Sequence, residues 1–227
     1  MITLAVDTSS KSCSVCVSVD NKPVAELLLN NKLTHSRTLL QVTRQVLGHA
    51  GLAMGDVSRL AVTVGPGSYT GLRIGLSFVK GLAMPQNIPC VGVSTLHALA
   101  YNLASRDGRV LSVLDARAGQ VYAALFEIQS GIVTRLTPDS ACLLSTLETV
   151  LKPGTMAVGD GSEMAARFFS HCKLQAAPME QRYLRASSLA AAAAFLPEVS
   201  GDTLVPNYHR KSQAEREREA KSEGSNS

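Results

Sequence analysis

The 227-residue chain has few charged residues and no long apolar run, and both shortages limit what it can be. Charged residues make up 18% of the sequence, and 22 Lys and Arg against 18 Asp and Glu leave a net charge of +4. This mild excess permits contact with nucleic acid but does not indicate a large RNA-binding surface. No uncharged run approaches membrane-spanning length, and residues 1–7 lack the basic lead of a signal peptide. We therefore expect a cytoplasmic protein that makes no membrane contact.

The usual patterns of metal and nucleophile sites are also missing. The five histidines have no spacing that makes a helical metal pair, and neither H-E-x-x-H nor G-x-S-x-G occurs. A single C-x-x-C, formed by Cys13 and Cys16, lies in an alternating segment, so the two thiols should point to opposite faces of a strand. An odd number of cysteines, five, suits a reducing compartment better than a disulfide framework. We expect no metal site and no catalytic residue.

What the sequence does have is an apolar fraction of 45%, enough for a substantial core, in an α/β order. Alternating apolar segments predict strands, and apolar residues at helical spacing predict helices between them. The predicted order over the first hundred residues is βββαβαβ, with elements at 2–6, 13–19, 24–29, from about 36 to 50, 60–64, 70–83 and 89–93. The first three strands should form an antiparallel meander.

The same order begins again from Arg109, which indicates a duplicated chain. The repeated elements are predicted at 110–114, 121–128, 132–136, from about 143, and 156–158. Asp7 and Asp115 end corresponding strands, and Gly65–Gly67 corresponds to Gly159–Gly161. We predict two α/β domains of one topology, 1–105 and 106–208, followed by a charged helix and tail at 209–227. Since ligands bind such sheets where strands end, a site is expected in the cleft between the two aspartates.

Residues 7–12 could form a phosphate-binding hairpin, because they offer a carboxylate, hydroxyls and an ammonium group between two strands. The segment contains no glycine, although close backbone approach to a phosphate generally needs one. The candidates for cofactor binding are Asp7, Thr8 and Ser9, with Asp115 from the second domain. They support an alternative in which the chain is an ATP-dependent kinase or ATPase that uses Asp7 and Asp115.

Residues 65–75, Gly-Pro-Gly-Ser-Tyr-Thr-Gly-Leu-Arg-Ile-Gly, form a glycine turn that leads into a helix. The segment is neither a Walker loop nor G-x-G-x-x-G. Gly71 and Gly75 stand one turn apart on one face, so another element can approach closely there. The spacing does not decide whether that element is the chain's own sheet or a partner helix.

Taken together, several segments resemble the bacterial TsaB family, also called YeaZ, in order and spacing. They are residues 2–9, 34–40, 65–75, 80–83, 91–96 and 115–122, with a looser likeness at 159–161 and 206–210. The resemblance implies the actin-like ATPase fold, built of two ribonuclease-H-like halves. It also implies a non-catalytic scaffold that needs no cofactor by itself, with ATP or ADP possible only in the assembled complex. Older naming of the wider family suggests a glycoprotein peptidase. The sequence offers neither the nucleophile nor the set of metal ligands that such an enzyme needs.

The resemblance implies partners as well. These are the catalytic subunit TsaD, which transfers a threonylcarbamoyl group to N6 of adenosine in tRNA, and the small ATPase TsaE, with tRNA contacted only through the complex. A homodimer is expected when TsaD is absent. The two predicted helices would form the interface through eight residues: His35, Leu39, Val46, Gly71, Leu72, Gly75, Leu76 and Val79. On this reading Gly75→Leu should block partner binding while the fold stays intact.

One departure from the family pattern lies near the end of the chain. His209 stands where an apolar residue is commoner in the family's closing Pro-x-Tyr-x-Arg segment, and the residues after Lys211 are unusually charged. Contacts made by the C-terminal end are therefore the least defined part of the resemblance.

Overall fold

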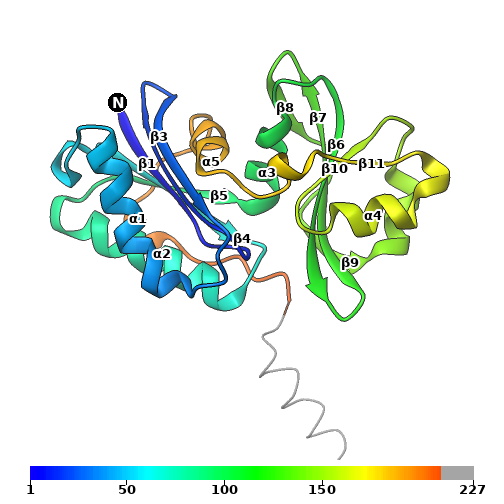
Figure 1. Ribbon diagram of the computed structural model, residues 1–227, viewed down its shortest axis with the longest axis horizontal. Coiled ribbons are helices and arrows are strands. Elements are labelled where there is room, and N and C mark those ends of the chain that lie inside the picture. The colour runs from blue at the N-terminus through cyan, green and yellow to red at the C-terminus, as the bar shows by residue number, and fades with distance from the viewer. Residues whose placement is uncertain (211–227) are drawn as a thin grey trace, which may run out of the picture.

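Figure 1 shows the computed structural model, which describes residues 1–210, as two lobes that are each built on one β-sheet. The sheet of the first lobe has the order β3-β2-β1-β4-β5. Its strands are β1 (Ile2–Asp7), β2 (Cys13–Val19), β3 (Lys22–Leu29), β4 (Arg59–Gly65) and β5 (Cys90–Ser94). The first three strands pair antiparallel, whereas β4 runs parallel to β1 and β5 parallel to β4. The predicted meander is confirmed.

The sheet of the second lobe repeats this topology. Its strands are β6 (Gly108–Arg117), β7 (Gln120–Gln129), β8 (Ile132–Arg135), β10 (Met156–Val158) and β11 (Gln175–Ala176). Their order is β8-β7-β6-β10-β11, which matches the first sheet strand for strand, and β9 (Ser140–Leu143) pairs separately with β7. The duplication predicted from the sequence is therefore confirmed.

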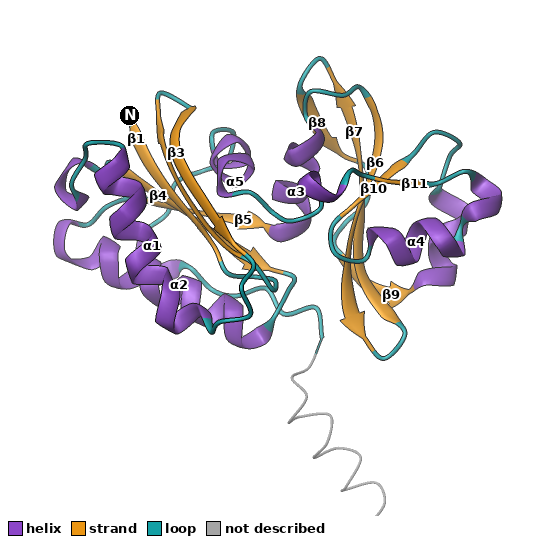
Figure 2. Cartoon of the chain, viewed as in Figure 1, coloured by secondary structure: helices purple, strands orange, loops and turns teal. Residues whose placement is uncertain are grey.

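Helices separate and cover the two sheets, as Figure 2 shows. On the outer face of the first sheet lie α1 (His35–His49) and α2 (Tyr69–Ala83). Between the sheets lie α3 (Thr95–Ala100) and α5 (Ala186–Ala193), and the far face of the second sheet carries α4 (Ser162–Phe168) and η4 (Leu144–Val150). The remaining short 3-10 helices are η1 (Met54–Asp56), η2 (Met84–Gln86), η3 (Tyr101–Leu103), η5 (Ser170–Cys172), η6 (Met179–Gln181) and η7 (Gly201–Thr203).

The two cysteines of the C-x-x-C pattern lie on opposite faces of β2, as the strand alternation predicts. Cys13 belongs to the apolar core under α1 and α2, and Cys16 belongs to the core between the sheets. Burial raises the pKa of the Cys13 thiol to about 11 and that of Cys16 to about 12. The two thiols therefore cannot share one metal ion.

The helix expected from about Leu143 is present as the 3-10 helix η4. The predicted end of the second domain is wrong. The domain does not extend to residue 208, because α5 packs on β1 and β2 of the first lobe and Val199 pairs with Cys90 of β5. The first sheet has an apolar inner face, and these C-terminal residues cover it. Of the predicted C-terminal helix and tail, residues 211–227 lie outside the described residues.

Candidate functional site: the cleft between the lobes

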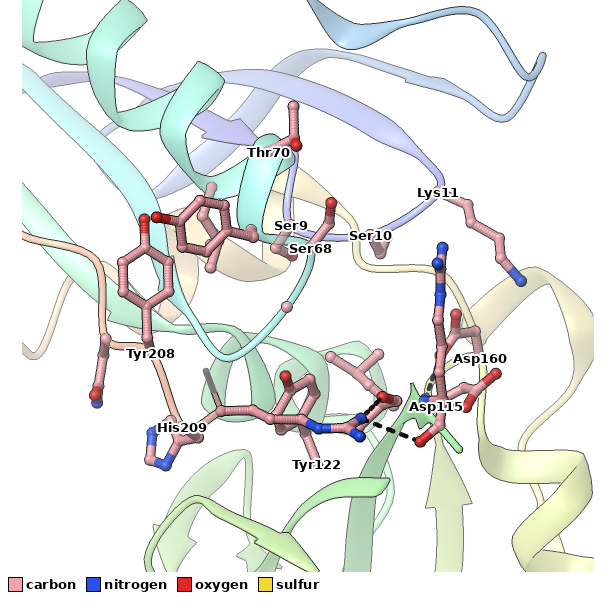
Figure 3. Close-up of a pocket in the computed structure, with 18 residues that line it drawn as sticks. Ser9, Ser10, Lys11, Ser68, Thr70, Asp115, Tyr122, Asp160, Tyr208 and His209 are labelled. Atoms are coloured by element: carbon pink, nitrogen blue, oxygen red, sulfur yellow. Dashed lines mark hydrogen bonds between the residues drawn. The ribbon is translucent and has the colours of Figure 1, made fainter. Parts of the chain in front are cut away.

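A cleft of about 780 Å³ lies where the two lobes meet. It is lined by the β1–β2 hairpin, the β6–β7 hairpin, the glycine turn before α2 and the residues around Tyr208. Figure 3 shows Ser9, Ser10 and Lys11 on one side and Asp115 with Asp160 on the other. The expected cleft is therefore present between the ends of β1 and β6, and its role as a binding site stays a prediction.

Asp7 lies beneath this cleft and does not line it. Its Oδ1 accepts hydrogen bonds from the main-chain N–H and the hydroxyl of Ser9, at 3.0 and 2.6 Å, and from the hydroxyl of Thr63 at 2.8 Å. Burial raises the pKa of the fully buried Asp7 carboxyl, and the hydrogen bonds from Ser9 and Thr63 oppose this shift. The side chain thus organises the hairpin and is not placed to contact a ligand in the cleft.

The first turn of α2 packs directly on the β1–β2 hairpin. The main-chain N–H of Ser68 donates to the Ser9 carbonyl at 2.7 Å, and the Thr8 hydroxyl donates to the Gly71 carbonyl at 2.7 Å. A Cβ atom at Gly71 would lie 2.0 Å from the Thr8 carbonyl oxygen. One at Gly75 would lie 2.4 Å from the Thr8 hydroxyl. The glycines of α2 therefore serve close approach to the chain's own hairpin, which resolves the alternative that the spacing left open.

This packing also overturns the residues predicted for the partner interface. Seven of them are buried inside the chain: Leu39, Val46, Gly71, Leu72, Gly75, Leu76 and Val79. The physical reason is that the apolar stripe of each helix faces the first sheet. The eighth, His35, is half-buried, and its Nε2 donates to the Ser10 carbonyl at 2.9 Å, which ties the start of α1 to the hairpin. The choice of α1 and α2 as the interacting helices stays a prediction, but other side chains must make the contact.

The second hairpin contributes an exposed carboxylate. Asp115 lines the cleft, and its Oδ1 accepts from the main-chain N–H of Arg117 at 2.7 Å. The main-chain N–H of Asp115 donates to Asp160 Oδ1 at 3.0 Å, and burial raises the pKa of the Asp160 carboxyl. Lys11 acts on Asp160 across the cleft and opposes that shift. Asp115 and Lys11 thus line the cleft, whereas Asp7 does not, so the predicted pair of aspartates is not brought together.

The C-terminal segment bridges the lobes, a role that sequence reasoning missed. The Asn207 N–H donates to the Val64 carbonyl at 2.7 Å, and the Tyr208 ring stacks on Tyr69 with the centroids 4.6 Å apart. On the other side, the Arg210 guanidinium donates to the Ala116 carbonyl of the β6–β7 hairpin. The only signal for this role was the likeness of residues 206–210 to the closing Pro-x-Tyr-x-Arg segment.

Chemically, the cleft is a polar space of mixed charge. Ser10, Lys11 and Ser68 of the first lobe line it together with Asp115, Arg117 and Asp160 of the second lobe. Such a lining can hold an anionic group with hydrogen-bond acceptors. Among residues 1–210, the one group of side chains that could share a metal ion lies outside the cleft, on the second lobe.

Comparisons with known proteins agree with this architecture. Residues 30–215 match a family model described as TsaD: tRNA N6-adenosine threonylcarbamoyltransferase. The chain is 35% identical over 152 residues, 67% of its length and 66% of the other, to the Bacillus subtilis protein named tRNA threonylcarbamoyladenosine biosynthesis protein TsaB. The matched parts of the chain span about half to two thirds of the length of such curated relatives.

Solved structures give the fold. One from Pseudomonas aeruginosa, described as an uncharacterized protein with similarity to peptidase YEAZ, is 25% identical, has a TM-score of 0.78 and covers 92% of this chain and 99% of its own. An activator of 2-hydroxyisocaproyl-CoA dehydratase from Clostridium difficile shares the fold alone, at 12% identity and a TM-score of 0.51, over 96% of this chain and 98% of its own.

The duplicated topology and the cleft between two hairpins thus define a protein of the actin-like ATPase fold with two ribonuclease-H-like halves. Within this class, the chain belongs to the TsaB (YeaZ) family. No helix within residues 1–210 combines the length and apolar character needed to cross a membrane.

Proposed function

We propose that the protein is a non-catalytic scaffold subunit of the cytoplasmic machinery that transfers a threonylcarbamoyl group to N6 of adenosine in tRNA. It binds the catalytic subunit TsaD, acts together with the ATPase TsaE, and meets tRNA only through that complex. The names of the relatives support the pathway. The observation that carries the non-catalytic role is the packing of α2 on the β1–β2 hairpin, which engages Ser9 and Thr8 with the chain's own backbone.

This packing matters because a hairpin that binds phosphate needs free donor groups and access from the cleft. Here the main-chain N–H of Ser68 donates to the Ser9 carbonyl. The Asp7 side chain lies in the interior, where Ser9 and Thr63 donate hydrogen bonds to it. A nucleotide bound to the isolated chain would meet no acidic group from this hairpin. The mixed-charge cleft, with Lys11 and Arg117, could form one side of a site for ATP or ADP. A partner would complete that site in the assembled complex.

The proposed partner surface is the outer face of α1 and α2, which lie side by side on the first sheet in Figures 1 and 2. Leu40 on α1 is 47% exposed, and Phe78 on α2 is half-buried. Gly48 and Gly81 are exposed, and a Cβ atom at either would meet nothing. A surface with apolar side chains and small residues allows helices of a partner to approach closely. In the absence of TsaD, a second copy of the chain occupies the same surface as a homodimer.

The experiment is a titration of purified TsaD with the full chain, followed by calorimetry, together with an assay of tRNA modification in the presence of TsaE. Leu40→Glu is expected to weaken TsaD binding by about 30-fold or more, because a charge would be buried at the interface. The matched control is Ile132→Glu, which changes a 68% exposed apolar residue on β8 of the second lobe. Equal affinity of the two variants for TsaD would exclude this face as the partner surface. If the wild-type chain modified tRNA in a mixture without TsaD, the scaffold role would be excluded.

A further inference from the structure

Two 3-10 helices on the far side of the second sheet bring together three side chains that the sequence separates. Glu148 lies on η4, and His171 and Cys172 end η5. One ligand atom of each, a carboxylate oxygen, a ring nitrogen and the thiol sulfur, all lie within 4.8 Å of one another. The His171 Nε2 donates to Glu148 Oε1 at 2.9 Å, across 23 positions of sequence.

The three side chains are mounted on the core of the second lobe. Leu147, next to Glu148, and Phe169, near His171, are both buried in the cluster under α4 and η4, and Cys172 packs against the same cluster. The Cys172 N–H donates to the Phe169 carbonyl at 3.0 Å, and the rings of Phe169 and His171 have centroids 6.1 Å apart. The backbone that carries the donors is therefore held in place, and the Glu148 and His171 side chains, 57% and 55% exposed, are accessible to an ion from solvent.

The donor set is chemically selective. One carboxylate, one imidazole and one thiolate suit a borderline cation such as Zn²⁺, whereas Mg²⁺ and Ca²⁺ prefer oxygen ligands only. Tetrahedral bonds of about 2.0 to 2.3 Å place ligand atoms about 3.3 to 3.8 Å apart, so a small contraction of the present cluster would close around the ion.

We propose that Glu148, His171 and Cys172 form a binding site for a Zn²⁺ ion, with water at the fourth position. On binding, the Cys172 thiol loses its proton to solvent, and the His171 proton moves from Nε2 to Nδ1 as the ion replaces the hydrogen bond to Glu148. The expectation of no metal, drawn from the sequence, rested on spacing within single helices and strands. Such spacing cannot reveal metal-ligating side chains that lie on two separate elements and come together only in the folded chain.

The site is tested on the full chain by titration with Zn²⁺ alone and, by absorbance, with Co²⁺. We expect one ion per chain and a thiolate-to-cobalt charge-transfer band. Cys172→Ser should abolish the band and weaken Zn²⁺ binding by more than about 100-fold, and His171→Ala should weaken it comparably. The matched control is Cys142→Ser, which removes another partly exposed thiol and should leave both readouts unchanged.

Folding is checked for each variant by circular dichroism. Glu148→Gln changes an exposed side chain and serves as the second variant in case Cys172→Ser fails to fold; a roughly tenfold or greater weakening of Zn²⁺ binding is expected. The proposal is overturned if the wild-type chain binds no Zn²⁺, if Glu148→Gln binds it unchanged, or if the cobalt band depends on Cys142 instead of Cys172. None of these readouts involves TsaD, so the outcome is independent of the scaffold role.

Discussion

The hydroxyl of Thr8 donates a hydrogen bond of 2.7 Å to the main-chain carbonyl of Gly71, 63 positions further along the chain. This bond joins the tip of the first hairpin to the first turn of α2 at a point where the two backbones nearly touch. The contact leaves no room for a side chain at residue 71. It also explains why a glycine pair at helical spacing lies on the inner face of this helix.

Gly71→Ala is expected to lower the free energy of unfolding by about 1 to 3 kcal/mol, because the new Cβ would overlap the Thr8 carbonyl and force the helix away from the hairpin. The control is Gly81→Ala on the same helix, where a Cβ meets nothing. That variant should be unchanged or more stable by up to about 1 kcal/mol, through helix propensity. Urea denaturation measures both. Equal stabilities would contradict the packing described here.

Asp7→Asn is expected to change how stability depends on pH. Because the folded-state pKa of Asp7 is raised above its ordinary value of 3.8, its stabilising contribution is fully present below that pH and is lost as pH rises through the folded pKa. The wild-type chain should therefore lose stability relative to Asp7→Asn between acid and neutral pH. Denaturation of both proteins over a pH series tests this, and a constant difference between them would show that the pKa of Asp7 is not raised.

Tyr208→Ala should lower the free energy of unfolding by about 1 kcal/mol, because it removes the stack on Tyr69 and the hydrogen bond from Arg73 Nε. Faster amide exchange is expected at Asn207, whose N–H bonds to Val64. The control is Val205→Ala, at a 68% exposed residue of the same segment. If the two variants matched in both readouts, the aromatic stack would not hold the C-terminal segment.

The isolated chain should hydrolyse ATP no faster than background, since Asp7 is buried beneath the cleft and donates no ligand into it. Asp115→Ala should leave that background unchanged. A coupled phosphate-release assay, repeated after adding TsaD and TsaE, separates activity of the chain from activity of the complex. Hydrolysis by the chain alone that is lost on Asp115→Ala would favour the kinase-like alternative.

The two amphipathic helices of the first lobe were predictable, because an apolar period of 3.6 residues reports one buried face. Its strands were predictable as short apolar segments between turns, and β1, β2 and β4 are buried on both faces. α5 was not, since apart from Ser187 and Ser188 the segment Ala186–Ala193 is apolar and has no separate polar and apolar faces to detect. β11 has only two residues, Gln175 and Ala176, which is too short for any alternation. Tertiary pairing alone forms that strand.

The site was predicted in outline and missed in detail for a related reason. Strand ends at Asp7 and Asp115 indicated a cleft between the hairpins, and the cleft is there. Whether a carboxylate points up into the cleft or down into the protein depends on donors such as Thr63, which lies 56 positions from Asp7. The glycine spacing on α2 likewise indicated a close neighbour without identifying it, and the neighbour is Thr8.

The return of the chain to the first lobe has a consequence for its synthesis. The inner face of the first sheet, with Ala5, Cys16 and Val91, is covered by α5. All five strands of this sheet leave the ribosome long before α5 is translated. A nascent chain that stopped before Ala186 would hold an open apolar sheet in water. Premature termination anywhere in the second lobe should therefore yield an aggregation-prone product and not a stable single-lobe fragment.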